Sequence, residues 1–435
     1  MKIAIVSLGC SKNLVDTEKL LGLLISNDLK ITNNFNEADA IIINTCGFIE
    51  PAKKEAIDTI LQMSEYENCK HLIVMGCLVQ RYKKELEEEL YEVDKFIKIS
   101  EYNNLGDILS EELGIKISNT YGKTDRVLSG KPWMAYLRIS DGCDNRCSYC
   151  AIPLIRGRYI STPIEELIIE ANKLVKMGVK ELNIIAQDTT RYGLDLYGKR
   201  RLLDLLSELN NIEELHWIRV LYMYPDEIDE ELIKGISKLN KVLPYFDIPV
   251  QYGNDKLLKL MNRRGSVEEI KNVIERIRIT FKNPILRTTI IVGFPYETSD
   301  DFNDTLNFIE EIKWDKLGAF TYSKEEDTKA YDMDNEIDED IKIERLNILM
   351  NTQNEITNLN NKKYINETIE VLIEGYDALL NVYRGRGFMH APDGIDGQVF
   401  VYSDEKLNLG EFVMVKINDF KNHDLIGEYK RRVMI

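Results

Sequence analysis

Three cysteines fall within eight residues near the middle of the chain, at Cys143, Cys147 and Cys150. A structural zinc site normally closes with four protein ligands, whereas an iron–sulfur cube held by three thiolates leaves one iron open. An open iron can bind a reactant directly. The spacing therefore favours a reactive cluster, and a zinc site completed by a distant fourth ligand is the alternative.

This C-x3-C-x2-C spacing, with the aromatic Tyr149 before the last cysteine, resembles the signature of the radical S-adenosylmethionine (SAM) superfamily. The resemblance implies that Cys143, Cys147 and Cys150 hold a 4Fe-4S cluster. It also implies that the open iron of this cluster binds the amino and carboxylate groups of SAM.

A second set of cysteines lies in the N-terminal third, where three apolar stretches are typical of buried parallel strands. Each stretch is followed within two residues by a cysteine: 3–8 by Cys10, 40–44 by Cys46 and 71–75 by Cys77. Helical patterns separate the stretches, so the three strand ends should point the same way and share one crevice. We predict a second three-thiolate cluster there, with buried structural thiols as the alternative. Cys69 precedes its strand and is assigned no role.

In the middle of the chain, six apolar stretches alternate with helical patterns. Six β/α units in series predict an open barrel, since eight would close it, and such barrels carry their chemistry at the carboxyl ends of the strands. Gln187, Gln251 and Gly293 follow three of these strands and are candidate SAM contacts, although residues of this kind also mark ordinary turns. Arg156 and Arg158 are candidates to bind a carboxylate of SAM or substrate, with a surface salt bridge as the alternative.

The C-terminal stretch changes to a period of two, with five short apolar runs separated by Gly, Asp and Asn, at 369–373, 379–383, 398–401, 412–417 and 425–429. These runs predict a small antiparallel β-barrel. Modules of this kind often bind RNA. Residues 361–435, however, carry 10 Lys and Arg against 12 Asp and Glu, a balance that disfavours a surface for phosphates.

At 435 residues the chain is too long for one typical core, so its length predicts two or three domains, and the patterns along the chain divide it into three. They are an N-terminal doubly wound parallel sheet in residues 1–117, an open six-unit barrel with a trailing helix in residues 130–360, and the small antiparallel barrel in residues 361–435. The expected fold class is α/β.

Composition and charge bear on the partners of the protein and on its location in the cell. The formal net charge of −17 argues against a large nucleic-acid surface and suits a basic protein partner, although acidity alone also keeps a protein in solution. The sequence has no apolar run near the ~20 residues of a membrane span, and residues 1–6 are typical of a strand rather than a signal peptide. We therefore expect no membrane association and a cytoplasmic location. Seven cysteines, an odd number, fit metal ligation in a reducing compartment.

Taken whole, the chain resembles the methylthiotransferases, which combine a three-cysteine N-terminal domain, a radical-SAM core and a C-terminal TRAM domain. The matching stretches are 9–16, 156–159, 221–225, 261–265 and 287–295. Relatives that modify tRNA typically begin with a Gly-Cys-Gln-Met-Asn stretch, so Ser11 and Lys12 favour the branch that modifies a ribosomal protein. Tyr252 stands where the family is expected to have histidine, so no role of that histidine is carried over.

The resemblance implies transfer of a methylthio group to the β-carbon of one aspartate in small-subunit ribosomal protein S-twelve, with two SAM molecules and two 4Fe-4S clusters. The implied catalytic cysteines are Cys143, Cys147 and Cys150 on one cluster and Cys10, Cys46 and Cys77 on the other. An electron donor and a sulfur donor of unspecified identity complete the expected partners, and no tRNA is expected. A tRNA adenosine methylthiotransferase is the alternative from the same class. A non-enzymatic RNA-binding protein with zinc on its cysteines is the alternative from another.

Overall fold

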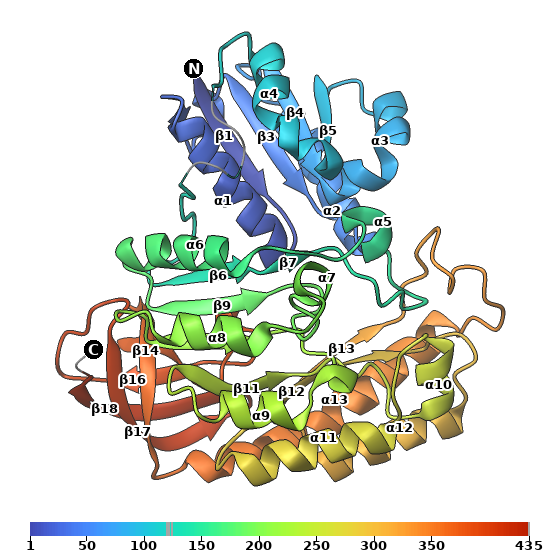
Figure 1. Ribbon diagram of the computed structural model, residues 1–435, viewed down its shortest axis with the longest axis vertical. Helices are drawn as coiled ribbons and strands as arrows, with labels where there is room; N and C mark the ends of the chain where they lie inside the picture. Colours follow the sequence, from blue (N-terminus) through green and yellow to red (C-terminus); the bar gives the residue numbers. More distant parts are fainter. Residues whose placement is uncertain (119–121, 123–124, 434–435) are drawn as a thin grey trace.

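A computed structural model describes residues 1–118, 122 and 125–433 of the chain. Figure 1 shows the N-terminal domain at the top of the view, a central sheet with its helices below it, and a C-terminal barrel beside the central sheet. The described residues form a five-stranded sheet, a six-stranded sheet, a closed five-stranded barrel and a two-stranded sheet. The predicted α/β class, with an open central barrel and a small terminal one, is confirmed.

The N-terminal sheet has the strand order β2-β1-β3-β4-β5, and all of its neighbouring strands are parallel. Its strands are β1 (Lys2–Ser7), β2 (Lys30–Ile31), β3 (Ala40–Thr45), β4 (His71–Gly76) and β5 (Lys95–Lys98). Its helices are α1 (Ser11–Ile25), α2 (Glu50–Ser64), α3 (Cys77–Glu89) and α4 (Leu105–Leu113). Ala40 and Ile42 of β3 pack on the side of α1 and α4, whereas Ile41 and Ile43 pack on the side of α2 and α3. Burial on both faces explains the continuous apolar sequence of this strand.

The central sheet is parallel throughout, with the order β13-β12-β11-β10-β9-β6 and two open edges. Its strands are β6 (Met134–Arg138), β9 (Glu181–Ile185), β10 (Trp217–Val220), β11 (Val242–Asp247), β12 (Ile285–Val292) and β13 (Lys316–Thr321). A two-stranded sheet, β7 (Ser140–Asp141) and β8 (Ile160–Ser161), frames the Cys143 loop and was not anticipated from the sequence. It is too short for its periodicity to be recognised.

Helices cover the outer face of the central sheet and share one apolar core with it. They are α6 (Ile164–Lys176), α7 (Leu194–Tyr197), α8 (Leu202–Asn210), α9 (Glu230–Ile236), α10 (Asp255–Leu260), α11 (Val267–Thr280), α12 (Ser299–Ile312) and α13 (Glu339–Asn361), with α5 (Ile152–Arg156) after the cysteine loop. Short 3-10 helices are η1 (Phe35–Glu37), η2 (Ile99–Asn104), η3 (Pro225–Glu227), η4 (Lys362–Tyr364) and η5 (Pro392–Gly394). Among the described residues, none of the helices combines the length and apolar character needed to cross a membrane.

The C-terminal barrel closes in the order β14-β15-β16-β18-β17. Its strands are β14 (Thr368–Asp377), β15 (Val382–Gly387), β16 (Val399–Tyr402), β17 (Phe412–Lys421) and β18 (Asp424–Arg432). One pair, β16 with β18, is parallel, so the barrel is not antiparallel throughout. β15 also begins later than expected, because the backbone N–H groups of Leu379 and Leu380 donate to Asp377 Oδ1 and hold a turn there.

The barrel packs against the inner face of the central sheet, which carries buried charges. Arg386 of β15 pairs with Glu181 of β9, and Arg219 of β10 pairs with the same carboxylate. Asp396, in the loop before β16, accepts a hydrogen bond from Arg287 of β12. In Figure 1 the N-terminal domain lies above the β6 edge of the central sheet, next to β6 and β7.

Candidate active site

The structure gathers Cys10, Cys46 and Cys77, the N-terminal trio, at one end of the first sheet. Thr45, the last residue of β3, and Gly76, the last residue of β4, are register partners. Cys46 directly follows Thr45, and Cys77 directly follows Gly76. Cys10 caps the start of α1 after β1, the strand on the other side of β3. A Cβ placed on Gly9 would lie 2.7 Å from the Cβ of Cys46, so the Cys10 loop packs directly on Cys46. Parallel pairing therefore places the three cysteines at the same end of this sheet.

Cys143, Cys147 and Cys150, the core trio, follow β6 and β7 at the carboxyl edge of the central sheet. The backbone N–H of Cys143 donates to the carbonyl of Gly157, and the N–H of Cys150 donates to the carbonyl of Cys147. These two bonds fix the loop at both ends. Two groups from later loops reach Cys147 Sγ: the hydroxyl of Tyr224, which follows β10, at 3.6 Å, and Nη1 of Arg263, which follows α10, at 3.9 Å.

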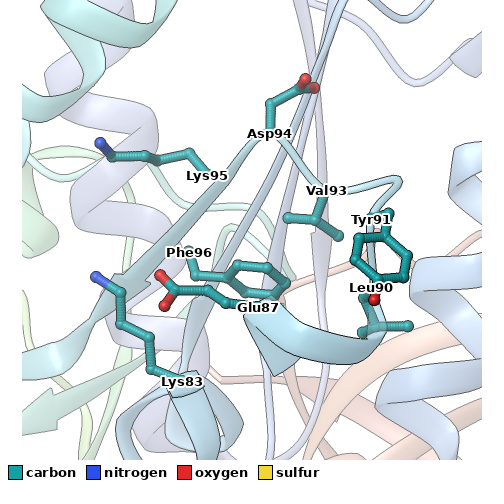
Figure 2. Close-up of a pocket in the computed structure, with 8 residues that line it drawn as sticks. All are labelled: Lys83, Glu87, Leu90, Tyr91, Val93, Asp94, Lys95 and Phe96. Atoms are coloured by element: carbon teal, nitrogen blue, oxygen red, sulfur yellow. The ribbon is translucent and has the colours of Figure 1, made fainter. Parts of the chain in front are cut away.

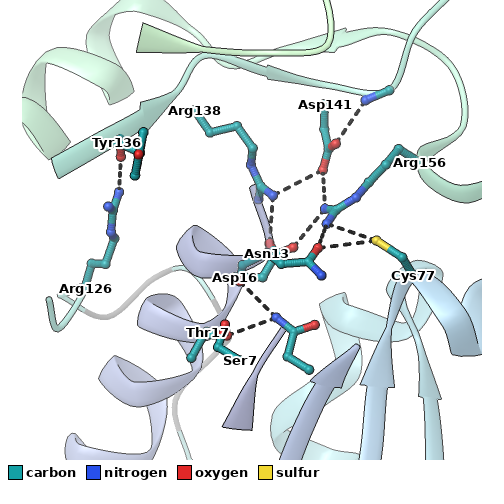
Figure 3. Close-up of polar contacts among 12 residues, drawn as sticks. Ser7, Asn13, Asp16, Thr17, Cys77, Arg126, Tyr136, Arg138, Asp141 and Arg156 are labelled. Carbon is teal, nitrogen blue, oxygen red and sulfur yellow. Dashed lines mark hydrogen bonds and ion pairs between the residues drawn. The ribbon is translucent and has the colours of Figure 1, made fainter. Parts of the chain in front are cut away.

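Arg156 connects the two trios. It lies on α5, six residues after Cys150, and its Nη2 donates to Asn13 Oδ1 at 2.7 Å and lies 3.7 Å from Cys77 Sγ. Its Nη1 pairs with Asp16 of α1 at 2.8 Å and with Asp141 at 3.2 Å. Figure 3 shows this arginine between α1 and the strand end of the core. The surface salt bridge considered from the sequence is wrong for Arg156, which is buried, and right for Arg158, which pairs with Asp144 at the surface.

The electrostatics of this network are set by burial and by paired charges. Burial opposes ionisation of Asp16, but Arg138 and Arg156 together hold the pKa of its carboxyl below the ordinary value. Burial raises the pKa of the Cys77 thiol to about 12, with Arg156 acting in the opposite direction, and raises that of Cys143 to about 11. The neighbouring guanidinium groups are suited to stabilise thiolates once a metal displaces the protons.

The candidate SAM contacts lie at the carboxyl ends of their strands, the edge that also carries the core trio. The Oε1 atom of Gln187 is buried and has no hydrogen-bond partner among the described residues. Gln251 adopts φ +77° and is held by backbone hydrogen bonds with Thr289 and Ile291 of β12. Gly293 adopts φ +75° and packs against the Lys342 side chain, so its small size has a packing reason. Their contact with SAM stays a prediction.

Each trio offers three cysteine sulfurs as metal ligands. Among the residues that the structure describes, no group of three or more His, Cys, Asp or Glu side chains lies in an arrangement that could hold a metal ion. A zinc ion draws its thiolates to about 2.3 Å from one point, whereas a cube binds each thiolate at a separate iron. Three thiols with nearby guanidinium groups fit a cluster of the second kind.

A hollow elsewhere on the N-terminal domain does not belong to this site. It has a volume of about 380 Å³ and lies on α3 and β5 (Figure 2). Its lining residues are Lys83, Glu87, Leu90, Tyr91, Val93, Asp94, Lys95 and Phe96. No cysteine lines it, so it is separate from both trios.

Several residues in the contact networks around the thiols carried no role in the sequence analysis. They are Asn13, Asp16, Tyr224 and Arg263. All four fall within the stretches 9–16, 221–225 and 261–265 that carry the family resemblance. Those stretches were the available signal, but a partner on another domain cannot be identified from spacing along the chain.

Comparisons with known proteins agree with this architecture. Models of three families match the chain: uncharacterized protein family UPF0004 over residues 2–98, the radical SAM superfamily over residues 137–309 and the TRAM domain over residues 365–429.

Two solved structures resemble the fold. The radical SAM methyltransferase TsrM from Kitasatospora setae superposes on this chain with a TM-score of 0.54 at 11% identity, covering 73% of this chain and 72% of its own. The cobalamin-dependent radical enzyme OxsB has a TM-score of 0.51 at 14% identity, covering 82% of this chain and 56% of its own. Fold and site define a radical-SAM enzyme with an added cysteine-bearing domain.

Curated relatives narrow this class. The ribosomal protein uS12 methylthiotransferase RimO of Acetivibrio thermocellus is 47% identical over 98% of both chains, and that of Clostridioides difficile is 49% identical over 98% of both. The chain belongs to the RimO family of radical-SAM methylthiotransferases.

Proposed function

We propose that this protein transfers a methylthio group to the β-carbon of an aspartate in ribosomal protein uS12, the small-subunit protein S-twelve. The names of its relatives support this substrate. The observation that carries the proposal is the pair of cysteine trios, each at the carboxyl end of a parallel sheet and joined through Arg156. Two separate sulfur-ligand sets at one edge suit a reaction that needs one centre to activate carbon and another to deliver sulfur.

We assign one 4Fe-4S cluster to the core trio, where SAM would also bind, and a second to the N-terminal trio. When bound, these groups supply one-electron chemistry that can break a C–H bond which is neither acidic nor electrophilic. The chain's own contribution is to bind, to orient and to exclude water. Arg263 and Tyr224 contact Cys147, and Arg156 contacts Cys77, so each trio has a cation beside one sulfur. Gln187, Gln251 and Gly293 are retained as proposed SAM contacts.

The three domains are proposed to divide the work. Residues 1–117 would hold the N-terminal cluster, residues 130–360 the core cluster and SAM, and residues 361–435 would form the TRAM module. The matched family ranges lie within these bounds and support the division. An electron donor and a sulfur donor are also required, and a ribosomal target and reduced thiols favour a cytoplasmic setting. The acidic chain, with a net charge of −17, supports a basic protein rather than tRNA as substrate.

The proposal is tested by incubating purified uS12 with the anaerobically reconstituted enzyme, SAM, a reductant and sulfide. Mass spectrometry should find one added methylthio group on a single aspartate of uS12. Unmodified uS12, together with a methylthiolated adenosine in tRNA offered in a parallel reaction, would overturn the proposal in favour of the tRNA alternative.

A further inference from the structure

Lys12 is a buried lysine whose ammonium group has no carboxylate partner in the part of the chain that the structure describes. It lies on the first turn of α1, two residues after Cys10, and its side chain and backbone together are only 8% exposed. Its Nζ lies 3.3 Å from the centre of the Tyr222 ring, across the boundary between the N-terminal domain and the core. Within residues 1–118, 122 and 125–433, no carboxylate lies within 4.0 Å of this nitrogen. Burying an ammonium without an anion is costly, and a ring face offsets only part of that cost.

Lys53 provides the comparison within the same interface. It is 9% exposed, and its Nζ lies 5.5 Å from the centre of the Tyr82 ring. Unlike Lys12, it pairs with two carboxylates, Glu50 at 2.8 Å and Glu325 at 3.2 Å. Two buried lysines of this boundary therefore differ: Lys53 has two carboxylate partners, and Lys12 has none among the described residues.

The position of Lys12 is between the two trios. Its chain neighbour Asn13 contacts the Cys77 thiol at 3.3 Å. On the other side, Tyr222 lies two residues before Tyr224, whose hydroxyl is 3.6 Å from Cys147 Sγ. An anion held by Lys12 would thus lie near the place where carbon activation and sulfur delivery must meet.

The fold holds Tyr222 in an uncommon backbone conformation to reach this lysine. Its φ is +61°, a region that residues with a Cβ seldom occupy. Its N–H donates to Asp247 Oδ2 at 2.9 Å, and its carbonyl accepts from the Thr189 N–H at 3.0 Å. Such conformations persist where the surroundings enforce them, and they concentrate at functional sites.

We propose that Lys12 binds the side-chain carboxylate of the target aspartate, and that Tyr222 orients the ammonium for it. This inference rests on the proposed function and names its specificity residue. The carboxylate of aspartate is bonded directly to the β-carbon, so a cation that fixes the carboxylate also fixes the reacting atom. SAM carries a carboxylate as well, but the core trio is assigned to bind it, whereas Lys12 belongs to the N-terminal side.

The test compares two forms of uS12, one with the target aspartate and one with asparagine in its place, the position being taken from the mass spectrum of the product. Equilibrium binding of each form to the reconstituted enzyme is measured for wild type, Lys12→Met, Lys12→Gln, Lys12→Arg and the matched control Lys53→Met. Wild type should prefer the aspartate form. Lys12→Met and Lys12→Gln should weaken that form about 10- to 100-fold, leave the asparagine form unchanged and so lose the preference. Lys12→Arg should recover part of the preference for the aspartate form, and Lys53→Met should keep that preference in full.

Three results would overturn the assignment. In the first, both neutral Lys12 variants keep the aspartate preference. In the second, they weaken both forms equally, as a merely structural lysine would. In the third, they lose affinity for SAM while the preference survives, which would assign the carboxylate to SAM. Failure of the wild-type enzyme to methylthiolate uS12 is a separate outcome. It would contradict the proposed function itself, not the role of Lys12 within that function.

Discussion

Nη2 of Arg156 lies 3.7 Å from Sγ of Cys77, although the two residues belong to different domains and are separated by 79 positions in the chain. Arg156 follows the core trio on α5, and Cys77 belongs to the N-terminal trio. Their contact is the direct physical link between the two sulfur sets. It ties the position of Cys77 to the segment that follows the core trio through a buried charge network.

Replacing Arg156 tests that link. Arg156→Met removes the cation that faces Cys77 and one of the two arginines on buried Asp16. Breaking a buried ion pair from one side costs about 3 kcal/mol or more. We expect the midpoint of denaturant unfolding to move to a lower denaturant concentration. We also expect the N-terminal trio to hold less iron. Arg158→Met, two residues away at an exposed pair, should change neither quantity, and equal behaviour of the two variants would contradict the link.

Gly9 tests the close approach of Cys10 and Cys46. It adopts φ +87°, and an added Cβ would lie 2.7 Å from Cys46 Cβ. Gly9→Ala should therefore reduce iron in the anaerobically purified protein to about half, as expected when one of two clusters is lost. Gly114→Ala is the control, because Gly114 also has a positive φ, of +64°, but nothing lies within 4 Å of an added Cβ. Iron and sulfide analysis is carried out on both variants. A Gly9→Ala protein with as much iron as the wild type would show that the N-terminal trio is not assembled as described.

His390 should make the junction of the core and the C-terminal barrel sensitive to pH. Burial, with Lys316, Arg219 and Arg386 nearby, lowers the pKa of its imidazole well below the ordinary 6.5. Below pH 6.5 the unfolded chain binds a proton that the folded chain excludes, so folding stability falls as pH falls, by up to about 1.4 kcal/mol per pH unit. Denaturant unfolding between pH 7.5 and 5 measures this slope. His390→Asn should flatten it, and an unchanged slope in that variant would assign the effect to other groups.

Much of this architecture could be predicted because its rules are local or topological. The continuous apolar sequences of β3 and β4 indicate strands buried on both faces, and parallel crossovers then require that Cys46 and Cys77 lie together. The Cys143 loop was located because its strand leads directly into it.

The remaining features depend on contacts between distant segments. The partners of Arg156 on α1 and α3, and the pairing of Arg386 with Glu181, join residues with no shared periodicity. The parallel pairing of β16 with β18 depends on barrel closure rather than on strand pattern. The late start of β15 depends on one side chain, Asp377, which competes with the strand for backbone N–H groups.

The most direct measurement compares Cys46→Ala and Cys147→Ala in one assay that follows both SAM cleavage and methylthiolation of uS12. With separate roles for the two trios, Cys147→Ala should abolish SAM cleavage, whereas Cys46→Ala should still form 5′-deoxyadenosine but release no methylthiolated uS12. Normal methylthiolated product from Cys46→Ala would contradict the two-centre account.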